Sequence, residues 1–283
     1  MTGRLTVVGT PIGNLEDISP RAVRALREAG AIYCEDTRRT RKLLSALGLP
    51  APRLVRLDRH TEAGMVGPAV ELIRGGTAVA LVSDAGMPTI SDPGTLLVKG
   101  VAAAGLPAEV VPGPCAVSAA IALSGLPASE YRFTGFLPRK GRERKESLAG
   151  IAAEPATVVV YEAANRVAAT VADLAEACGP EREMAAAREL TKLHEEVWRG
   201  TLGQAVEWLA GTVDEPRGEW VLVLGPSPGG AGPPPGPEDI TGALRARLAS
   251  GLDRREAVAE VAAELRLPKR VVYDAALRLK DPG

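Results

Sequence analysis

Short apolar runs alternate with amphipathic stretches through the first 111 residues of the chain. Runs rich in Val, Leu and Ala have the length of buried strands and lie at 5–8, 31–34, 54–57, 78–82 and 109–111. Helical patterns between them lie at 20–29, 41–47, 70–73 and 95–104. The first of these begins at Ser19-Pro20, because Ser caps free amides and Pro tolerates the first turn. This alternation predicts a mostly parallel sheet covered by helices on both faces.

A second α/β series follows, for which we also expect antiparallel strands. Its strand-like runs lie at 132–136, 157–161, 184–187, 196–199 and 220–224. Its helical patterns lie at 142–151, 166–178 and 202–209. We therefore predict an N-terminal α/β domain over residues 1–114 and a C-terminal α/β domain over residues 115–228.

Beyond residue 225 the composition changes to a run of Pro and Gly that excludes a helix or an inner strand. We assign residues 229–237 as a linker and residues 238–283 as a small helical tail. The tail helices are predicted at 238–249, 254–265 and 269–279. The last two resemble a helix-turn-helix superficially, although short paired helices are common.

Composition narrows the classes of protein. The 283 residues carry a formal charge of −1, 46% are apolar, and nine are aromatic, so Ala, Val and Leu fill the core. Three scattered cysteines and two distant histidines predict neither a disulfide framework nor a bound metal. The longest apolar stretch, Cys115 to Leu123, is too short for a membrane span, and the first residues lack the pattern of a signal peptide. A cytoplasmic location fits best.

Three loops rich in Gly and Pro follow strands of the first domain, at 9–14, 83–94 and 112–116. In open α/β sheets, ligands bind beyond the carboxyl ends of the strands, and small residues allow the backbone to approach them. The Gly-x-x-x-x-Gly-Lys-Ser/Thr motif of phosphate loops and the Gly-x-Gly-x-x-Gly fingerprint of NAD enzymes are both absent. The 12-residue second loop holds more Asp, Pro and Gly than a turn requires, which favours a ligand site.

Motifs spread from Val8 to Lys192 carry a resemblance. They are Val8-Gly9-Thr10-Pro11-Ile12-Gly13-Asn14-Leu15 with Asp17-Ile18-Ser19, Glu35-Asp36-Thr37-Arg38, Leu81-Val82-Ser83-Asp84-Ala85-Gly86, Ile90-Ser91-Asp92-Pro93-Gly94, Pro112-Gly113-Pro114-Cys115-Ala116, Gly135-Phe136-Leu137-Pro138, Tyr161-Glu162-Ala163 and Ala187-Arg188-Glu189-Leu190-Thr191-Lys192. In this order, they resemble the branch of the tetrapyrrole methylase superfamily that methylates small-subunit ribosomal RNA. Met87, Asn165 and Gly9 stand where this branch more often has Thr, His and Pro.

The resemblance implies transfer of a methyl group from S-adenosylmethionine to the 2′-hydroxyl of a cytidine ribose. The implied substrate is 16S rRNA near the decoding centre of the assembled small subunit. The resemblance also implies two α/β domains of the tetrapyrrole methylase type with the cofactor in the cleft between them, and a homodimer.

Residues in the loops and at strand ends are the candidates for cofactor binding. Asp84 is the foremost, because it follows a strand inside the second loop, although a cap or an Asx turn would also explain it. The amides of Cys115 and Ala116 begin a helix and are available to a ligand. The full set is Pro11, Asp84, Met87, Ile90, Cys115, Ala116, Tyr161, Ala163, Gly218 and Trp220.

A ribose hydroxyl is a poor acid, so a base or a polarising cation is expected beside it. Glu189, Lys192 and Asp36 are the candidates, and a surface salt bridge is the alternative for the first two. Two basic clusters are candidates for phosphate binding, with a solvated helix face as the alternative. They are Arg38, Arg39, Arg41 and Lys42, and Arg139, Lys140, Arg142, Arg144 and Lys145.

Other functions stay open at this point. A methyltransferase of the same superfamily acting on a tetrapyrrole or another small substrate would not need the two basic clusters. A non-catalytic binder of nucleotides or ribosomes would bind S-adenosylmethionine weakly or not at all. An NAD-dependent enzyme is disfavoured by the missing fingerprint.

Overall fold

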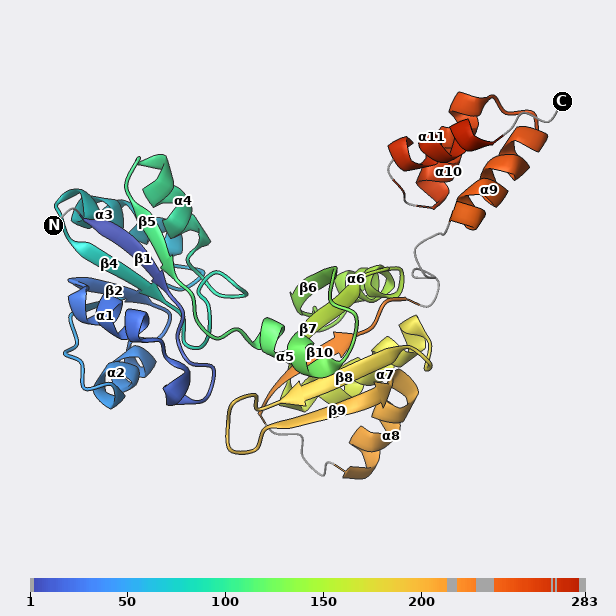
Figure 1. The fold of residues 1–283 in the computed structure, drawn as a ribbon. Helices are drawn as coiled ribbons and strands as arrows, with labels where there is room; N and C mark the ends of the chain where they lie inside the picture. The colour runs from blue at the N-terminus through green and yellow to red at the C-terminus, as the bar shows by residue number, and fades with distance from the viewer. Residues whose placement is uncertain (1–2, 213–217, 228–236, 266, 268, 280–283) are drawn as a thin grey trace. The chain divides into compact units, whose positions relative to one another are not determined.

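The computed structural model describes residues 3–212, 218–227, 237–265, 267 and 269–279 (Figure 1). The chain divides into two compact units, Met1–Pro226 and Ser227–Gly283, and each is described by itself. Within the described residues, no helix is long and apolar enough to cross a membrane.

The first sheet has five strands in the order β3-β2-β4-β1-β5, and every neighbouring pair is parallel. The strands are β1 (Arg4–Val8), β2 (Ala31–Cys34), β3 (Arg53–Arg56), β4 (Ala78–Val82) and β5 (Ala108–Val111). The parallel sheet predicted from the alternating pattern is therefore confirmed. Because all strands run the same way, their carboxyl ends and the loops that follow lie at one edge.

Alternate residues of these strands face opposite layers of helices. Val8 and Ile32 pack with α1 (Pro20–Glu28) and α2 (Thr37–Ala46). Leu5 and Tyr33 pack with α3 (Glu62–Arg74) and α4 (Thr95–Ala103). Helices cover both faces, as predicted.

Two of these helices are longer than the sequence pattern indicates. Helix α2 begins at Thr37 because the Asp36 carboxylate caps it, accepting a hydrogen bond from the Arg38 amide at 2.8 Å. Helix α3 begins at Glu62 and contains Pro68, which obscures the helical pattern of its first half.

The second sheet has the order β6-β7-β10-β8-β9, in which β6 and β7 are parallel and the other pairs are antiparallel. The strands are β6 (Tyr131–Phe136), β7 (Thr157–Ala163), β8 (Glu183–Arg188), β9 (Glu196–Thr201) and β10 (Glu219–Leu224). The helices of this region are α5 (Ala116–Ser124), α6 (Arg142–Ala152), α7 (Val167–Cys178) and α8 (Leu202–Thr212). The expectation of a second α/β sheet with antiparallel strands is confirmed.

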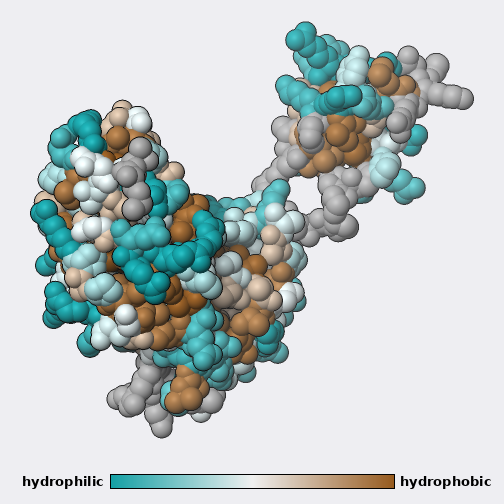
Figure 2. Space-filling model, turned by 60° about the vertical axis from the view of Figure 1, so that its left-hand side comes forward, coloured by the Kyte–Doolittle hydropathy of each residue, from teal (hydrophilic) through white to brown (hydrophobic). Residues whose placement is uncertain are grey.

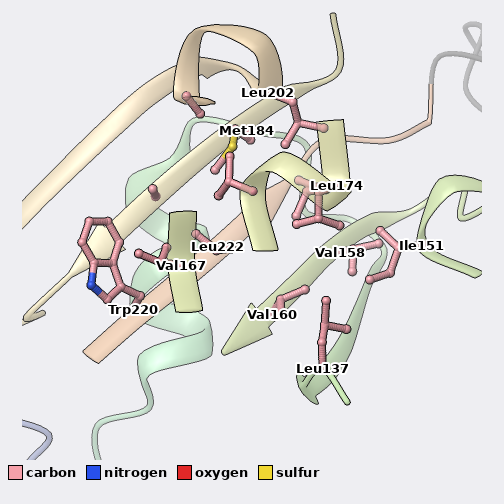
Figure 3. Packing of buried hydrophobic residues seen from close by; sticks show 14 of the residues in the cluster. Leu137, Ile151, Val158, Val160, Val167, Leu174, Met184, Leu202, Trp220 and Leu222 are labelled. Atoms are coloured by element: carbon pink, nitrogen blue, oxygen red, sulfur yellow. The ribbon is translucent and has the colours of Figure 1, made fainter. Parts of the chain in front are cut away.

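Two hydrophobic layers enclose this sheet. On one face, Val160 and Leu222 pack with Val167 and Leu174 of α7, and Figure 3 shows these side chains pointing toward one another. On the other face, Val159, Val221 and Val223 pack with α5. Both faces of the central strands are therefore buried under side chains and shielded from solvent.

The unit Ser227–Gly283 contains α9 (Pro237–Ala249), α10 (Arg254–Glu264) and α11 (Lys269–Arg278), close to the predicted bounds. Its own core includes Leu244, Val261 and Val272. Figure 2 shows hydrophobic residues in brown on the visible face of this unit. Pro237, the last residue of the predicted linker, is the first residue of α9, and residues 229–236 lie outside the described residues.

Leu222→Ala should destabilise the second sheet, because the Leu222 side chain on β10 is fully buried against α7 and α8. Deletion of a buried Leu side chain leaves a cavity and lowers the free energy of unfolding by about 2–5 kcal/mol. All three tryptophans lie at 198, 208 and 220, so urea unfolding followed by tryptophan fluorescence reports on this region.

Leu193→Ala is the matched control, since the Leu193 side chain is 91% exposed. We expect its free energy of unfolding to change by less than about 0.5 kcal/mol. Equal effects of the two substitutions would contradict the packing described above.

Candidate functional site: a cavity at the carboxyl edge of the parallel sheet

Both α/β regions of the unit Met1–Pro226 contribute residues to one cavity of about 440 Å³. This volume lies in the range of small-molecule and cofactor sites. Nine of the ten predicted cofactor residues line it: Asp84, Met87, Ile90, Cys115, Ala116, Tyr161, Ala163, Gly218 and Trp220. Pro11 is not among the lining residues, whereas its neighbour Ile12 is. The structure brings these positions together, and their role in binding stays a prediction.

Loop 83–94 forms one wall of the cavity and is tied to the first loop. Thr10 and Gly86 exchange two backbone hydrogen bonds, of 2.9 and 3.2 Å. Thr89 and Ser91 have φ angles of 73° and 67°, a region that non-glycine residues rarely adopt. Such conformations cost of order 1–3 kcal/mol each and cluster at functional sites.

The first and third loops meet through two glycines. A Cβ placed on Gly113 would lie 2.8 Å from the Cα and carbonyl carbon of Gly9, and a Cβ on Gly9 would lie 2.6 Å from Gly113. Only residues without a side chain allow the two backbones to approach this closely. This contact holds the first loop against the segment that leads into α5.

Aromatic side chains form the wall contributed by the second sheet. Tyr161 packs edge-to-face against Phe133 and Phe136, with ring centroids 4.8 and 5.6 Å apart. Phe136 is 55% exposed and lines the cavity. This wall offers a flat apolar surface to a planar ring.

Three carboxylates, Glu35, Asp84 and Asp92, line the cavity on the side of the first sheet. Burial raises the pKa of each. The charge of Asp84 raises the pKa of Glu35 further, and the charges of Glu35 and Asp84 help to raise the pKa of Asp92 to about 6. Asp84 accepts a hydrogen bond from the Asp36 amide at 3.1 Å and lies 3.5 Å from Nε of Arg39. Its carboxylate therefore joins the loop to the start of α2 rather than capping its own loop.

The cofactor-binding residues predicted from the sequence included neither Glu35 nor Asp92. Both belong to motifs quoted for the resemblance, Glu35-Asp36-Thr37-Arg38 and Ile90-Ser91-Asp92-Pro93-Gly94. For Glu35, the position just after a strand could have indicated the cavity, because Glu35 follows β2 much as Asp84 follows β4.

Glu162 also lines the cavity, but its carboxylate is committed to the fold. It is buried, and it accepts hydrogen bonds from the Ala163 amide at 2.8 Å and the Thr170 hydroxyl at 2.6 Å. Nε of Arg166 lies 3.3 Å from it. These bonds fix the end of β7, which carries Tyr161 and Ala163.

The structure joins two of the predicted catalytic residues to each other. Nζ of Lys192 donates to Glu189 at 2.7 Å and to Glu219 at 3.1 Å. Burial opposes the charge of Lys192, but the two carboxylates raise its pKa above the ordinary value. The Lys192 ammonium likewise lowers the pKa of Glu189. Neither residue lines the cavity, and neither has the pKa that favours a general base near neutral pH.

Asp36, the third predicted catalytic residue, is also engaged elsewhere. Its carboxylate accepts from the Arg38 amide and forms a 2.7 Å ion pair with the Arg38 guanidinium. These bonds hold the pKa of Asp36 well below its usual range. Asp36 caps α2 and does not line the cavity.

Most side chains of the two predicted RNA-binding clusters are exposed. Arg38, Arg41 and Lys42 are exposed on α2, whereas Arg39 lines the cavity beside Asp84. In the second cluster, Arg139, Lys140, Arg142 and Lys145 are exposed.

Arg144 requires a correction. Only 12% of its side chain is exposed, and it donates to Asp173 at 2.6 Å, to Thr170 at 3.1 Å and to the Pro138 carbonyl at 3.0 Å. Its guanidinium holds α6 against α7 and is not presented to a phosphate. Sequence spacing could not reveal this, because Asp173 lies 29 positions away.

The sequence model of the Tetrapyrrole (Corrin/Porphyrin) Methylases matches residues 4–206. Solved structures with this architecture include uroporphyrin-III C-methyl transferase from Thermus thermophilus complexed with S-adenyl homocysteine, with a TM-score of 0.54 and 23% identity. That match covers 79% of this chain and 97% of the other. Diphthine synthase matches with a TM-score of 0.58 and 18% identity, over 78% and 90% of the two chains. At these identities the likeness extends to the fold alone.

Curated relatives are similar over much more of the sequence. Ribosomal RNA small subunit methyltransferase I from Synechocystis sp. is 41% identical over 285 residues, covering 99% of this chain and 100% of that protein. The proteins of the same name from Pseudomonas aeruginosa and Thermotoga maritima are 39% and 43% identical. The Pseudomonas match covers 98% of this chain and 97% of the relative, and the Thermotoga match covers 78% and 98%. The chain belongs to the tetrapyrrole methylase family, and within it to the family of ribosomal RNA small subunit methyltransferase I.

Gly113→Ala should destabilise the protein, because its Cβ would meet the Gly9 backbone rather than a side chain that can rotate away. Strain of this kind lowers the free energy of unfolding by about 1–3 kcal/mol. Thermal unfolding of the purified variant measures the effect.

Gly64→Ala is the control, since a Cβ there meets nothing within 4 Å and Gly64 lies inside α3. Alanine favours a helix over glycine by up to about 1 kcal/mol, so we expect unchanged or higher stability. A Gly113 variant as stable as the Gly64 variant would show that the two loops can separate freely.

Proposed function

We propose that this chain transfers a methyl group from S-adenosylmethionine to the 2′-hydroxyl of a cytidine ribose in 16S rRNA, near the decoding centre of the small ribosomal subunit. The similarity over nearly the whole chain to proteins named ribosomal RNA small subunit methyltransferase I carries this proposal. The proposal also includes a cytoplasmic location, which the scattered cysteines favour, and a homodimer, which the resemblance implies.

The residues of the cavity fit this cofactor. The aromatic wall around Tyr161 suits a planar adenine. Cys115 is the N-cap of α5 without a side-chain hydrogen bond to the helix, so the first amides of α5 can meet a carboxylate. The carboxylates of Glu35 and Asp84 give the opposite wall the negative charge that complements an ammonium or a sulfonium.

When bound, the cofactor supplies an activated methyl group on a sulfonium centre. The protein then has to hold the ribose hydroxyl in line with that methyl group. Such positioning lowers the activation barrier by about 7–11 kcal/mol in favourable cases. The rigid loops tied together at Thr10–Gly86 and Gly9–Gly113 supply the required fixed geometry.

Mapping of ribose methylation tests the proposal. Mass spectrometry of 16S rRNA from a strain lacking the gene should show one cytidine without its 2′-O-methyl group, and the restored gene should return it. Unchanged methylation would overturn the proposal. Activity on a free tetrapyrrole instead of small subunits would establish the alternative suggested by the fold.

Asp84→Ala should weaken binding of S-adenosylmethionine while leaving the fold intact. The side chain lines the cavity and fixes the amide of Asp36, so its removal loses both a polar contact and a support of the wall. We expect about a tenfold rise in Kd by calorimetry, equivalent to about 1.4 kcal/mol. An unchanged Kd would remove Asp84 from the binding site, and no binding by the unaltered protein would favour a non-catalytic role.

The exposed basic side chains after Pro138 should contact RNA phosphates. Arg142 is 90% exposed, and the ion pair that it forms among the described residues is with Glu146 of its own helix. Each phosphate contact on single-stranded RNA contributes about 0.7 to the slope of log K against log salt. Joint substitution of Lys140, Arg142 and Lys145 by Gln should therefore flatten the slope by roughly 2.

Binding to small subunits at several salt concentrations measures this slope. Joint substitution of Arg24 and Arg27 by Gln on α1 is the control, because both are exposed and lie outside the two basic clusters. An unchanged slope with normal methylation would assign the segment after Pro138 to solvation alone.

A further inference from the structure

Methyl transfer to a hydroxyl releases one proton, and the residues chosen from the sequence to accept it are engaged elsewhere. Asp36 caps α2, and Glu189 pairs with Lys192. Five carboxylates line the cavity within the described residues: Glu35, Asp84, Asp92, Glu162 and Glu219.

Three of these carboxylates already hold strong partners. Asp84 binds the Asp36 amide and faces Arg39. Glu162 binds an amide, a hydroxyl and Arg166. Glu219 accepts from Lys192. Among the described residues, no ion pair within 4 Å involves Glu35 or Asp92.

The position of Asp92 favours it over Glu35. Its neighbour Ser91 packs against the end of β6, where Ser91 Oγ lies 3.2 Å from a Cβ placed on Gly135. The next residue, Phe136, is an exposed aromatic ring at the cavity, and the exposed basic segment follows. A nucleotide that reaches the cavity along this segment therefore arrives beside Asp92.

The chain around Asp92 is fixed on both sides. The Ser91 carbonyl accepts a hydrogen bond from Nη2 of Arg59 at 2.9 Å. The Gly94 amide donates to the buried Glu62 carboxylate at 2.9 Å. A group that must meet a reacting proton benefits from such a rigid support.

We propose that Asp92 is the catalytic residue that accepts the proton of the ribose hydroxyl. This inference rests on the proposed function. A bond forms between the hydroxyl oxygen and the methyl carbon as the carbon–sulfur bond breaks, and its electron pair stays on sulfur as a neutral thioether. The hydroxyl proton moves to the Asp92 carboxylate, which later releases it to solvent.

Several charged groups face Asp92 and set the pH range of this step. Burial raises the pKa of Asp92 most, Glu35 after β2 and Asp84 at the start of the loop raise it further, and the Ser83 hydroxyl and Arg59 lower it. Tyr161 on β7 faces it as well, and its own pKa is raised by burial. Asp92 accepts a proton only when ionised, so the rate should fall about tenfold per pH unit below about 6 and level off above it.

The test compares Asp92→Asn with Asp92→Glu in the full chain. Single-turnover methyl transfer to unmethylated small subunits is measured from pH 5 to 8.5, with Kd for S-adenosylmethionine measured by calorimetry. We expect Asp92→Asn to slow transfer by 10²–10⁴-fold and to abolish the fall below pH 6, because this is the typical contribution of general-base catalysis. Kd should change less than threefold, and Asp92→Glu should recover part of the rate.

Two further variants make the outcome decisive. Glu35→Gln removes a neighbouring negative charge, so it should move the midpoint of the pH profile downward. Glu176→Gln, on the exposed face of α7, should change neither the rate nor the midpoint. A normal rate and pH profile in Asp92→Asn, or loss of the pH dependence in Glu35→Gln instead, would overturn the assignment. Absence of methyl transfer by the unaltered enzyme would instead overturn the proposed function.

Discussion

The buried carboxylate of Glu62 organises the edge of the parallel sheet at which the cavity forms. It accepts hydrogen bonds from the amides of Gly94, Leu96 and Leu97, at 2.9, 2.6 and 3.4 Å. These amides begin α4, whose N-cap Gly94 has no side chain to satisfy them. A residue from a different helix therefore supplies the cap, and in doing so it fixes the end of loop 83–94. The opposite end of this loop follows β4, so a segment with two strained residues is held in one conformation.

Rigid loops alone do not make a site, because the cavity has walls from both sheets and these walls must also be held in a fixed position relative to each other. Glycines provide that contact in the unit Met1–Pro226. A Cβ on Gly13 would lie 2.4 Å from Cγ of Lys192, and the Asn14 amide donates to the Thr191 hydroxyl at 3.1 Å. The Glu189–Lys192 pair stiffens the same segment, and the φ angles of 50° at Glu189 and 64° at Thr191 show its tight curvature. We interpret Glu189 and Lys192 as residues that position the two walls, in place of the catalytic role predicted from sequence.

Local sequence patterns predicted the strands and the parallel first sheet because buried strands are continuous apolar runs with little dependence on distant residues. They also predicted that the three loops converge, since parallel strands bring their carboxyl ends to one edge. Only residues 70–73 of α3 were predicted, because Pro68 and two glycines interrupt the pattern of its first half. Helix α2 was predicted from residue 41, whereas the Asp36 cap starts it at Thr37. Arg144 and Glu162 show the limit most clearly, since their roles depend on partners that only the folded chain brings near. For the same reason the sequence could not distinguish the ionisable carboxylates of the cavity from those already paired.

The three helices of the tail share a hydrophobic core of their own. Its core, which includes Leu244, Val261 and Val272, is built from residues of α9, α10 and α11. One relative is matched over 98% of its own length by 78% of this chain, so membership of the family does not require a chain of this full length. The residues that line the cavity all fall between Ile12 and Val221, within the first unit. Within the described residues, the cavity is therefore lined by side chains of the first unit.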